Sequence, residues 1–495
     1  MKRARQGKGS LVDAKEKPIK EYFSQETRDR YGLHYLGISF VLAWYYCFWF
    51  APDTFTTAAI IDSLVTSSWL SALAVSGVAF LVAPLVLRNV HLYEHPHIMS
   101  IVAAVSSVAT IAFGMLPIAI NNPLIAHSVF PLIFGVCSSL MWVAWGELPA
   151  RRKSNFALHK FALAFGAVML PSIIIAMLLP HYVVDVFVGL MPIASAVVYA
   201  RENKRVADAE LPTLLPKATR TKTRTATAVI SLAIFMTCVA CYFNIAIIPN
   251  DNLLPDGYSY TVGIAGSAVV CLLIALAQRI SSKEFAAYRI LPWLVVTCAI
   301  ALAIFANNDE RFYNLSFVIS VALAGTLEVF LIAYFGSLAA KGHLSPVFAF
   351  SISSAVVRLG FFVGDVWAIV YERNLSLAEQ FTQPTTLLLG CAIVVILVLL
   401  MRQEMTILQL TQAPAKTSEI EEVCDAAIEE FSLSKREGEI LKLIARGYTI
   451  DNVSKKLVIS PYTTQTHVRH IYSKMHVHKR SELLDYLNMH REEGI

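Results

Sequence analysis

The stretch TTLLLGCAIVVILVLLMR, residues 385–402, separates two kinds of sequence. Long apolar runs dominate the chain before Met401, whereas the residues from Arg402 onward have the composition of an ordinary soluble protein. With 56% hydrophobic and 16% charged residues over 495 positions, the chain is too apolar and too long to be one soluble domain. The sequence therefore predicts a membrane domain that ends at 401 and a soluble domain after it.

A helix of about 20 apolar residues crosses the hydrocarbon core of a bilayer. Twelve runs meet this requirement, at residues 33–51, 68–87, 98–120, 124–146, 156–179, 182–200, 227–247, 258–278, 290–306, 315–339, 346–370 and 385–401. If the N-terminus is cytoplasmic, the segments on that side hold 24 Lys and Arg before Met401, and the opposite side holds only Arg311 and Arg373. Cytoplasmic loops are enriched in these residues, which supports the count of twelve.

The expected protein is a multi-pass protein of the cytoplasmic membrane with both termini in the cytoplasm. A central basic segment divides the spans into two sets of six, an arrangement that resembles the major facilitator transporters in topology. The charged Gly-rich motif of those transporters is absent from the corresponding stretch, Leu87 to Tyr93, so transport does not follow from the resemblance. The predicted domains are a basic tail (1–30), a membrane domain (31–401, with halves 31–200 and 227–401 and linker 201–226), an acidic amphipathic linker helix (402–430) and a C-terminal domain (431–495).

The C-terminal domain contains two connected motifs, LSKREGEILKLIARGYT at 433–449 and ISPYTTQTHVRHIYSKMHV at 459–477. Ser434 and Glu437 have the spacing of a capping box at the start of a helix. Ser460 caps a later helix with Pro461 in its first turn. From Phe431 onward the sequence resembles the LuxR/NarL-type helix-turn-helix domain. The expected fold class is therefore all-α: a twelve-span (6+6) transmembrane bundle followed by a cytoplasmic four-helix LuxR-type domain.

The helix that begins after Ser460 has the pattern of a recognition helix, with Val468 and Ile471 directed to the core and a polar, basic opposite face. The residues expected to contact DNA are Tyr462, Thr463, Gln465, Thr466, His467, Arg469, His470 and Lys474. The resemblance also implies phosphate contacts, or else merely solvated surface, at Lys455, Lys456, Lys479 and Arg480. Where the family usually has Val-Lys, this chain has Thr464 and Gln465, and Gln favours adenine by about 1–3 kcal/mol. Homodimerisation on DNA is implied by the resemblance.

The segment TSEIEEVCDAAIEEF, residues 417–431, has apolar residues at helical spacing opposite a row of Asp and Glu. Three interpretations are open for this acidic helix. It packs on the helix-turn-helix core, it forms a dimer contact, or it shields the basic recognition face until a signal arrives.

Three ionisable residues fall within the predicted spans, where charge is expensive and points to function. Glu328 and Arg358 are both near mid-membrane and could pair with each other. Asp365, two helical turns beyond Arg358, is a second possible partner for it. These three residues are candidates for a ligand site, and the alternative is an ion pair that only fixes helix packing. The aromatic run WYYCFWF at 44–50 predicts a lipid-facing or interfacial belt, or else part of a ligand pocket.

No nucleotide-binding loop, nucleophile elbow or kinase motif occurs, so the sequence predicts neither an enzyme nor a cofactor. His91, His95 and His97 lack the ligand cluster that would indicate a metal site. The predicted function is a membrane-embedded one-component transcription regulator that senses a small molecule of unknown identity through the bundle and binds promoter DNA. The alternative is a transporter-like protein with a regulatory DNA-binding tail.

Overall fold

The computed structural model describes residues 32–50, 58–88, 90–115, 128–152, 157–207, 209, 211–212, 214–215, 217–248, 253–254, 258–280, 287–411, 415–445, 450–478, 480, 482–484 and 486–487. Every regular element within these ranges is a helix, and they contain no strand. The chain divides into two compact units, one that ends at Thr411 and one that begins at Gln412. The predicted all-α fold class is confirmed.

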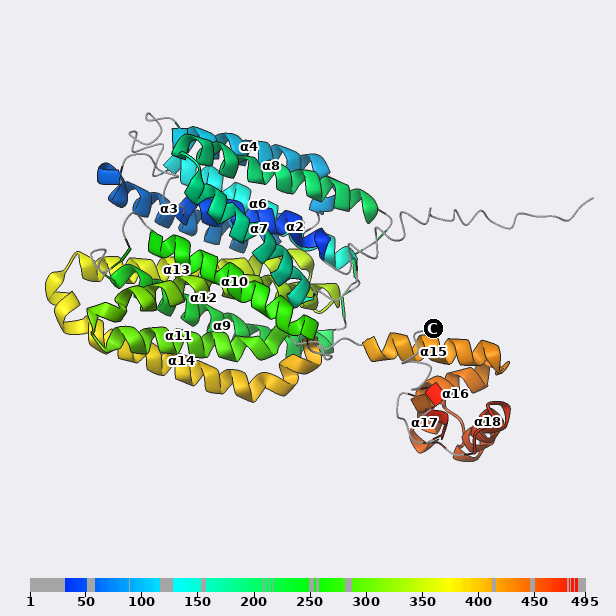
Figure 1. The fold of residues 1–495 in the computed structure, drawn as a ribbon. Helices are drawn as coiled ribbons and strands as arrows, with labels where there is room; N and C mark the ends of the chain where they lie inside the picture. The colour runs from blue at the N-terminus through cyan, green and yellow to red at the C-terminus, as the bar shows by residue number, and fades with distance from the viewer. Residues whose placement is uncertain are drawn as a thin grey trace, which may run out of the picture. The chain divides into compact units, whose positions relative to one another are not determined.

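The first unit is a bundle of long helices (Figure 1). Its helices are α2 (Leu36–Phe50), α3 (Ala58–Val86), α4 (Pro96–Met115), α6 (Phe130–Arg151), α7 (Leu158–Leu178), α8 (His181–Arg205), α9 (Lys217–Ile247), α10 (Tyr258–Ile280), α11 (Leu291–Ala306), α12 (Tyr313–Ala340), α13 (Pro346–Glu372) and α14 (Leu375–Thr411). Twelve helical stretches among the described residues are long and apolar enough to cross a membrane, which confirms the predicted number of spans. The last helix continues past the predicted end of its span at 401, as one helix through Thr411.

Helix α13 connects the two halves of this bundle, because it packs along α9 of its own half and also against α3 and α6 of the other. Its close approach to α9 depends on Gly360 and Gly364, spaced as in the small-residue motif of membrane helices. A Cβ atom on Gly364 would lie 2.4 Å from the carbonyl oxygen of Val239. Helices α7 and α10 form a second contact between the halves.

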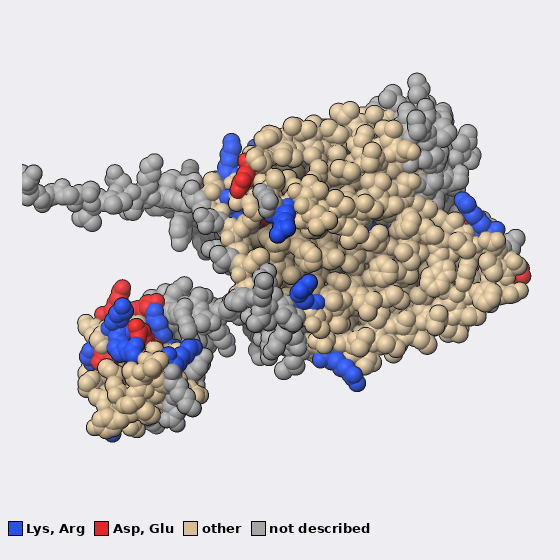
Figure 2. All heavy atoms as spheres, turned by 180° about the vertical axis from the view of Figure 1, so that it is seen from behind, with Lys and Arg blue, Asp and Glu red and all other residues tan. Residues whose placement is uncertain are grey.

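The outer surface of the bundle is apolar. Leu85, Val86, Leu178 and Ile280 are each more than two thirds exposed. In Figure 2 the middle of the visible face is almost entirely free of charged side chains, which gather toward the two ends. Such a surface would be unfavourable in water and suits contact with lipid. Together with the twelve spans it makes this chain a multi-pass membrane protein.

The second unit consists of α15 (Ala415–Glu430), α16 (Lys435–Ala445), α17 (Ile450–Leu457), α18 (Pro461–Lys474) and helical residues near 482–487. It has its own core, in which Ile440, Val453, Ile471 and Leu483 are fully buried.

The acidic helix α15 packs on this core. Cys424 and Ala427 are buried in it, and Ile428 contacts Gly438 of α16. Lys442 of α16 also pairs with Asp425, with 2.5 Å between Nζ and Oδ1. Of the three interpretations of this helix, packing on the helix-turn-helix core is the one that its described side chains show.

Three helices of this unit end at a residue other than glycine in the left-handed conformation. These residues are Ser432, Val458 and His476, with φ of 48°, 53° and 56°. After each of them the next backbone N–H donates back across the helix end, as Ile459 does to the Ser454 carbonyl at 3.1 Å. A β-branched residue is strained in this conformation, so Val458 stores energy in the turn between α17 and α18.

Replacing Val458 by Gly is expected to raise the free energy of unfolding of the second unit by about 1 kcal/mol, because relief of strain exceeds the added entropy of the unfolded chain. Val458 is 89% exposed, so little packing is lost with its side chain. Thermal unfolding of a fragment of residues 412–495 measures the change. Val458→Ala is the matched comparison: it removes the β-branch but keeps the Cβ atom, so it should recover only part of the gain in stability. A lower midpoint for the Gly variant would show that the turn is not strained.

Candidate nucleic-acid interface and intramembrane polar cluster

Helix α18 begins where the sequence predicts. The Ser460 hydroxyl accepts a hydrogen bond from the Thr463 backbone N–H at 3.0 Å, and Pro461 occupies the first turn. Thr464, Val468 and Ile471 lie on one face of the helix and are buried in the core. The predicted inward direction of Val468 and Ile471 is confirmed, and the opposite face is left to solvent.

A buried hydrogen bond fixes α18 against α17. The Ser454 and Thr464 hydroxyls lie 2.7 Å apart, and both side chains are almost fully buried. In the sequence, Thr464 stands out only as a departure from the family pattern. Its position four residues before Val468, on the same helical face, could have placed it in the core.

The outward face of α18 carries most of the residues predicted to contact DNA. Those that are exposed are Tyr462, Thr463, Gln465, Thr466, Arg469, His470 and Lys474. His467 and Arg480 are partly buried, and Lys456 on α17 is exposed. The side chain of Lys455 and the whole of Lys479 lie outside the described residues. Within the described part of the chain, Gln465 and Arg469 have neither a hydrogen bond nor an ion pair to another side chain, so both are available to an external partner.

Lys474 is engaged within the domain. Its Nζ lies 2.8 Å from Oε2 of Glu437, which also accepts from the Ser434 backbone N–H at 2.7 Å. The reciprocal hydrogen bond, from the Glu437 N–H to the Ser434 hydroxyl, completes the predicted capping box. Oε1 of Glu437 is 3.7 Å from Nδ1 of His470. Glu437 therefore ties the start of α16 to the end of α18, a role that the sequence analysis did not assign to it.

The environment of Glu437 favours its ionised form. Burial alone would raise the pKa of this carboxyl group, but the hydrogen bonds from Lys474 and from Ser434 outweigh burial and lower the pKa to about 2. Glu437 is thus a buried anion held beside the basic face of α18.

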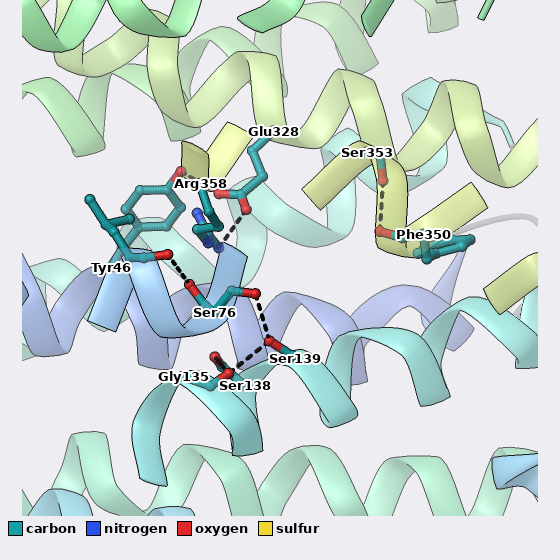
Figure 3. Close-up of polar contacts among 10 residues, drawn as sticks. Tyr46, Ser76, Gly135, Ser138, Ser139, Glu328, Phe350, Ser353 and Arg358 are labelled. Carbon is teal, nitrogen blue, oxygen red and sulfur yellow. Dashed lines mark hydrogen bonds and ion pairs between the residues drawn. The ribbon is translucent and has the colours of Figure 1, made fainter. Parts of the chain in front are cut away.

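In the membrane unit, Glu328 of α12 and Arg358 of α13 form the predicted ion pair, with 2.8 Å between Oε1 and Nη2 (Figure 3). Tyr46 of α2 donates its hydroxyl to the other oxygen of Glu328 at 2.6 Å. The guanidinium carbon of Arg358 lies 4.0 Å from the centre of the Tyr45 ring and 5.2 Å from that of Trp142, both in the first half. These contacts, here called the central latch, join the halves in the middle of the bundle.

Asp365 pairs with a different partner from the one considered in the sequence analysis. Its Oδ2 accepts a hydrogen bond from Nε1 of Trp69 on α3 at 3.1 Å, and Arg358 is occupied by Glu328. Asp365 therefore also links the second half of the bundle to the first, through an aromatic donor and not through a salt bridge.

The aromatic run at 44–50 lies in the interior. Trp44, Tyr45, Tyr46 and Phe48 are at most 3% exposed, so the prediction of a lipid-facing belt is wrong. Helix α2 packs against α6, α7 and α8, so aromatic rings at successive positions of α2 all lie against other helices. Three residues of the central latch were not identified from the sequence: Tyr45 and Tyr46 come from this run, and Trp142 comes from α6.

Residues 431–487 match the family described as "Bacterial regulatory proteins, luxR family". The chain is 39% identical over 69 residues to the oxygen regulatory protein NreC of Staphylococcus epidermidis, a match that covers 14% of this chain and 32% of that protein. It is 44% identical over 54 residues to NreC of Staphylococcus carnosus, covering 11% of this chain and 25% of that one. The chain thus spans a third or less of the length of these relatives.

The membrane unit is similar to solved structures of transporters. One is the proton:xylose symporter XylE of the major facilitator superfamily, with a TM-score of 0.47 and 11% identity, covering 76% of this chain and 96% of that one. Another is the nucleoside transporter NupG, with a TM-score of 0.43 and 15% identity, covering 74% and 98%. The chain therefore joins a LuxR-type helix-turn-helix DNA-binding domain at residues 431–487 to a twelve-helix membrane domain.

Proposed function

We propose that this chain is a membrane-embedded one-component transcription regulator, in which the bundle binds a small molecule and the LuxR-type domain binds promoter DNA as a homodimer. The observation that carries the proposal is the exposed face of α18. Gln465 and Arg469 extend from it without partners in the described part of the domain, on the same polypeptide as a membrane bundle. Both side chains make base contacts in the major groove of many complexes.

The proposed orientation places both termini in the cytoplasm, where DNA is accessible. It is supported by the bias of Lys and Arg toward the segments on that side of the spans. The cytoplasmic membrane is the corresponding location.

The proposed ligand site includes Glu328, Arg358 and Asp365. All three belong to the second half of the bundle, and each contacts an aromatic side chain of the first half. A ligand that separated the halves at these contacts would shift the bundle between two states. The size of that shift is bounded by the difference in the ligand's affinity for the two states.

Arg469→Ala is expected to weaken operator binding by roughly 10-fold or more, since a specific base or phosphate contact contributes about 1–3 kcal/mol. The full-length protein in lipid nanodiscs is incubated with fragments of its own genome, and the retained fragments are sequenced. Lys435→Ala is the matched control, because Lys435 is an exposed cation on α16. Retention of the same fragments by the Arg469 variant, with unchanged affinity at physiological salt, would remove Arg469 from the interface.

A transporter with a regulatory tail is the second candidate, favoured by the contacts of Tyr46 with Glu328 and of Trp69 with Asp365 between two six-helix halves. Reconstituted vesicles distinguish the two functions. Accumulation of a substrate that persists after removal of residues 412–495 would favour transport.

A further inference from the structure

Asp365 is a buried carboxylate without a counter-charge. It is 7% exposed and lies within the α13 span. Among the described residues no Lys, Arg or His lies within ion-pair distance of it, and its hydrogen bond comes from the neutral Trp69 indole. An ionised carboxylate inside a membrane is unfavourable unless a positive charge lies beside it. Asp365 is therefore suited to hold a cation or a proton.

The surroundings of Trp69 favour an organic cation. The Trp69 ring stacks on Tyr242 with 6.1 Å between centroids and meets Phe50 edge-on at 5.2 Å. Phe50 in turn stacks on Tyr260 at 5.3 Å. These four rings, here called the aromatic cage, stack face to face in pairs in this structure, and if they were separated their negative π-faces would attract an ammonium group. A carboxylate next to such rings is the combination that selects a charged amine over a neutral molecule.

The end of the bundle nearest Asp365 carries an excess of acidic side chains. At this end α13 finishes at Glu372 and α14 begins at Leu375. The C-terminal end of α14, at Thr411, lies at the opposite end of the bundle. Among the described residues the exposed charged groups at the end nearest Asp365 are Glu310, Glu372 and Glu379 against Arg311 and Arg373. Arg311 is already paired with Asp309, at 2.6 Å. The remaining negative charge raises the local concentration of cations.

The aromatic cage is shared between the two halves. Phe50 and Trp69 belong to the first half, and Tyr242, Tyr260 and Asp365 belong to the second. The rings are in direct contact, so a ligand enters between them only if the halves move apart at this end. Binding there would stabilise the separated arrangement over the one in which Trp69 donates to Asp365.

We infer that Asp365 and the aromatic cage bind a small organic ammonium ion. The carboxylate holds the charged nitrogen, and the rings cover its alkyl or aromatic substituents. This inference rests on the proposed function, in which the bundle binds the signal, and it gives that signal a chemical class.

The test uses purified full-length protein in nanodiscs without DNA. Tetraethylammonium and protonated phenethylamine are titrated, with 2-phenylethanol as the neutral isostere and phenylacetate as the anion, and binding is followed by tryptophan fluorescence and thermal stability. We expect the wild type to bind the two ammonium ions and neither counterpart. Asp365→Asn, whose amide oxygen still accepts from Trp69, should bind them at least tenfold more weakly. Glu94→Gln, an exposed carboxylate in the turn Leu92–Glu94 before α4 and away from this end, is the matched control and should bind normally.

Equal affinity of Asp365→Asn and wild type, equal binding of 2-phenylethanol and phenethylamine, or no ammonium binding by the wild type would each overturn the inference. If the Asn variant does not fold, Tyr242→Leu removes one wall of the aromatic cage without changing charge, and it should also weaken binding. A different result would show that the proposed function is wrong while the ammonium site is correct. In that case ammonium ions bind normally, but operator occupancy in the assay of Arg469 does not change with their addition.

Discussion

Replacing Arg358 by Met is expected to destabilise the membrane unit by about 3–5 kcal/mol, the usual effect of removing one partner of a buried ion pair. Arg358 is 1% exposed, and its partner Glu328 is 2% exposed. Without the guanidinium, the Glu328 carboxylate keeps the hydrogen bond from Tyr46 but loses its counter-charge in a medium of low dielectric constant. Met fills a similar volume, so the lost charge and not a cavity causes the change. Thermal unfolding in nanodiscs measures it.

A double variant distinguishes the contribution of the ion pair to stability from the contribution of Arg358 packing. Glu328→Gln together with Arg358→Met removes both charges, and the Gln oxygen can still accept from Tyr46. Most of the lost stability should therefore return. Arg311→Met is the matched single control, because the Arg311 side chain is 83% exposed and its pair with Asp309 contributes little. If the double variant is as unstable as Arg358→Met, then the stacking of Arg358 on Tyr45 is the main contribution and not the charge pair.

Replacing Glu437 by Ala is expected to destabilise the second unit by about 2–3 kcal/mol. The change removes half of the capping box and the hydrogen bond to Lys474, interactions that contribute about 1 kcal/mol and about 1.5–3 kcal/mol in comparable sites. We take the low end for the second, since the Lys474 side chain is 41% exposed and solvent screens the pair. Thermal unfolding of residues 412–495 should show a midpoint lower by roughly 10 °C.

The same carboxylate gives the second unit a defined acid sensitivity. The pKa of Glu437 in the folded domain is about 2, below the value near 4.3 of an unfolded chain. Its contribution to stability is therefore complete above about pH 4.3 and is lost as the pH falls toward 2. Glu439→Ala on the same helix is the control, since Glu439 forms only a partly exposed pair with Arg436. Equal acid sensitivity of wild type and Glu437→Ala would show that another group controls acid unfolding.

Much of the fold could be predicted because the signals are local. Length and hydropathy within one segment define each membrane span, and the cap at Ser460 is set by its neighbours in sequence. The direction of the aromatic run could not be predicted. Helix α2 is apolar on every side, which is equally typical of a helix that faces lipid and of one enclosed by other helices. The sequence of this helix therefore does not show that it is buried over nearly its whole length.

Contacts between side chains that are distant in the sequence were the second feature that could not be fully predicted. Arg358 and Asp365 lie two turns apart on one face of α13, which made their pairing plausible. The other predicted pair, Arg358 with Glu328, is the one that forms, whereas the partner of Asp365, Trp69 of α3, was not predicted. The link between Glu437 and Lys474 spans 37 residues and appears only when α16 and α18 pack together. Side-chain chemistry identified the candidates, but tertiary packing selected the pairs.

Helix α14 has a mechanical consequence for the regulator proposed above. Beyond Pro384 no proline interrupts it before Thr411, so the last 27 residues form one stiff rod of about 40 Å. The hydrocarbon core is only about 30 Å thick, and ten residues beyond Met401 extend the rod by about 15 Å. A twist or tilt of α14 inside the bilayer therefore moves Thr411 as well, because no break in the helix lies between the span and this residue. Thr411 lies beyond the lipid headgroups.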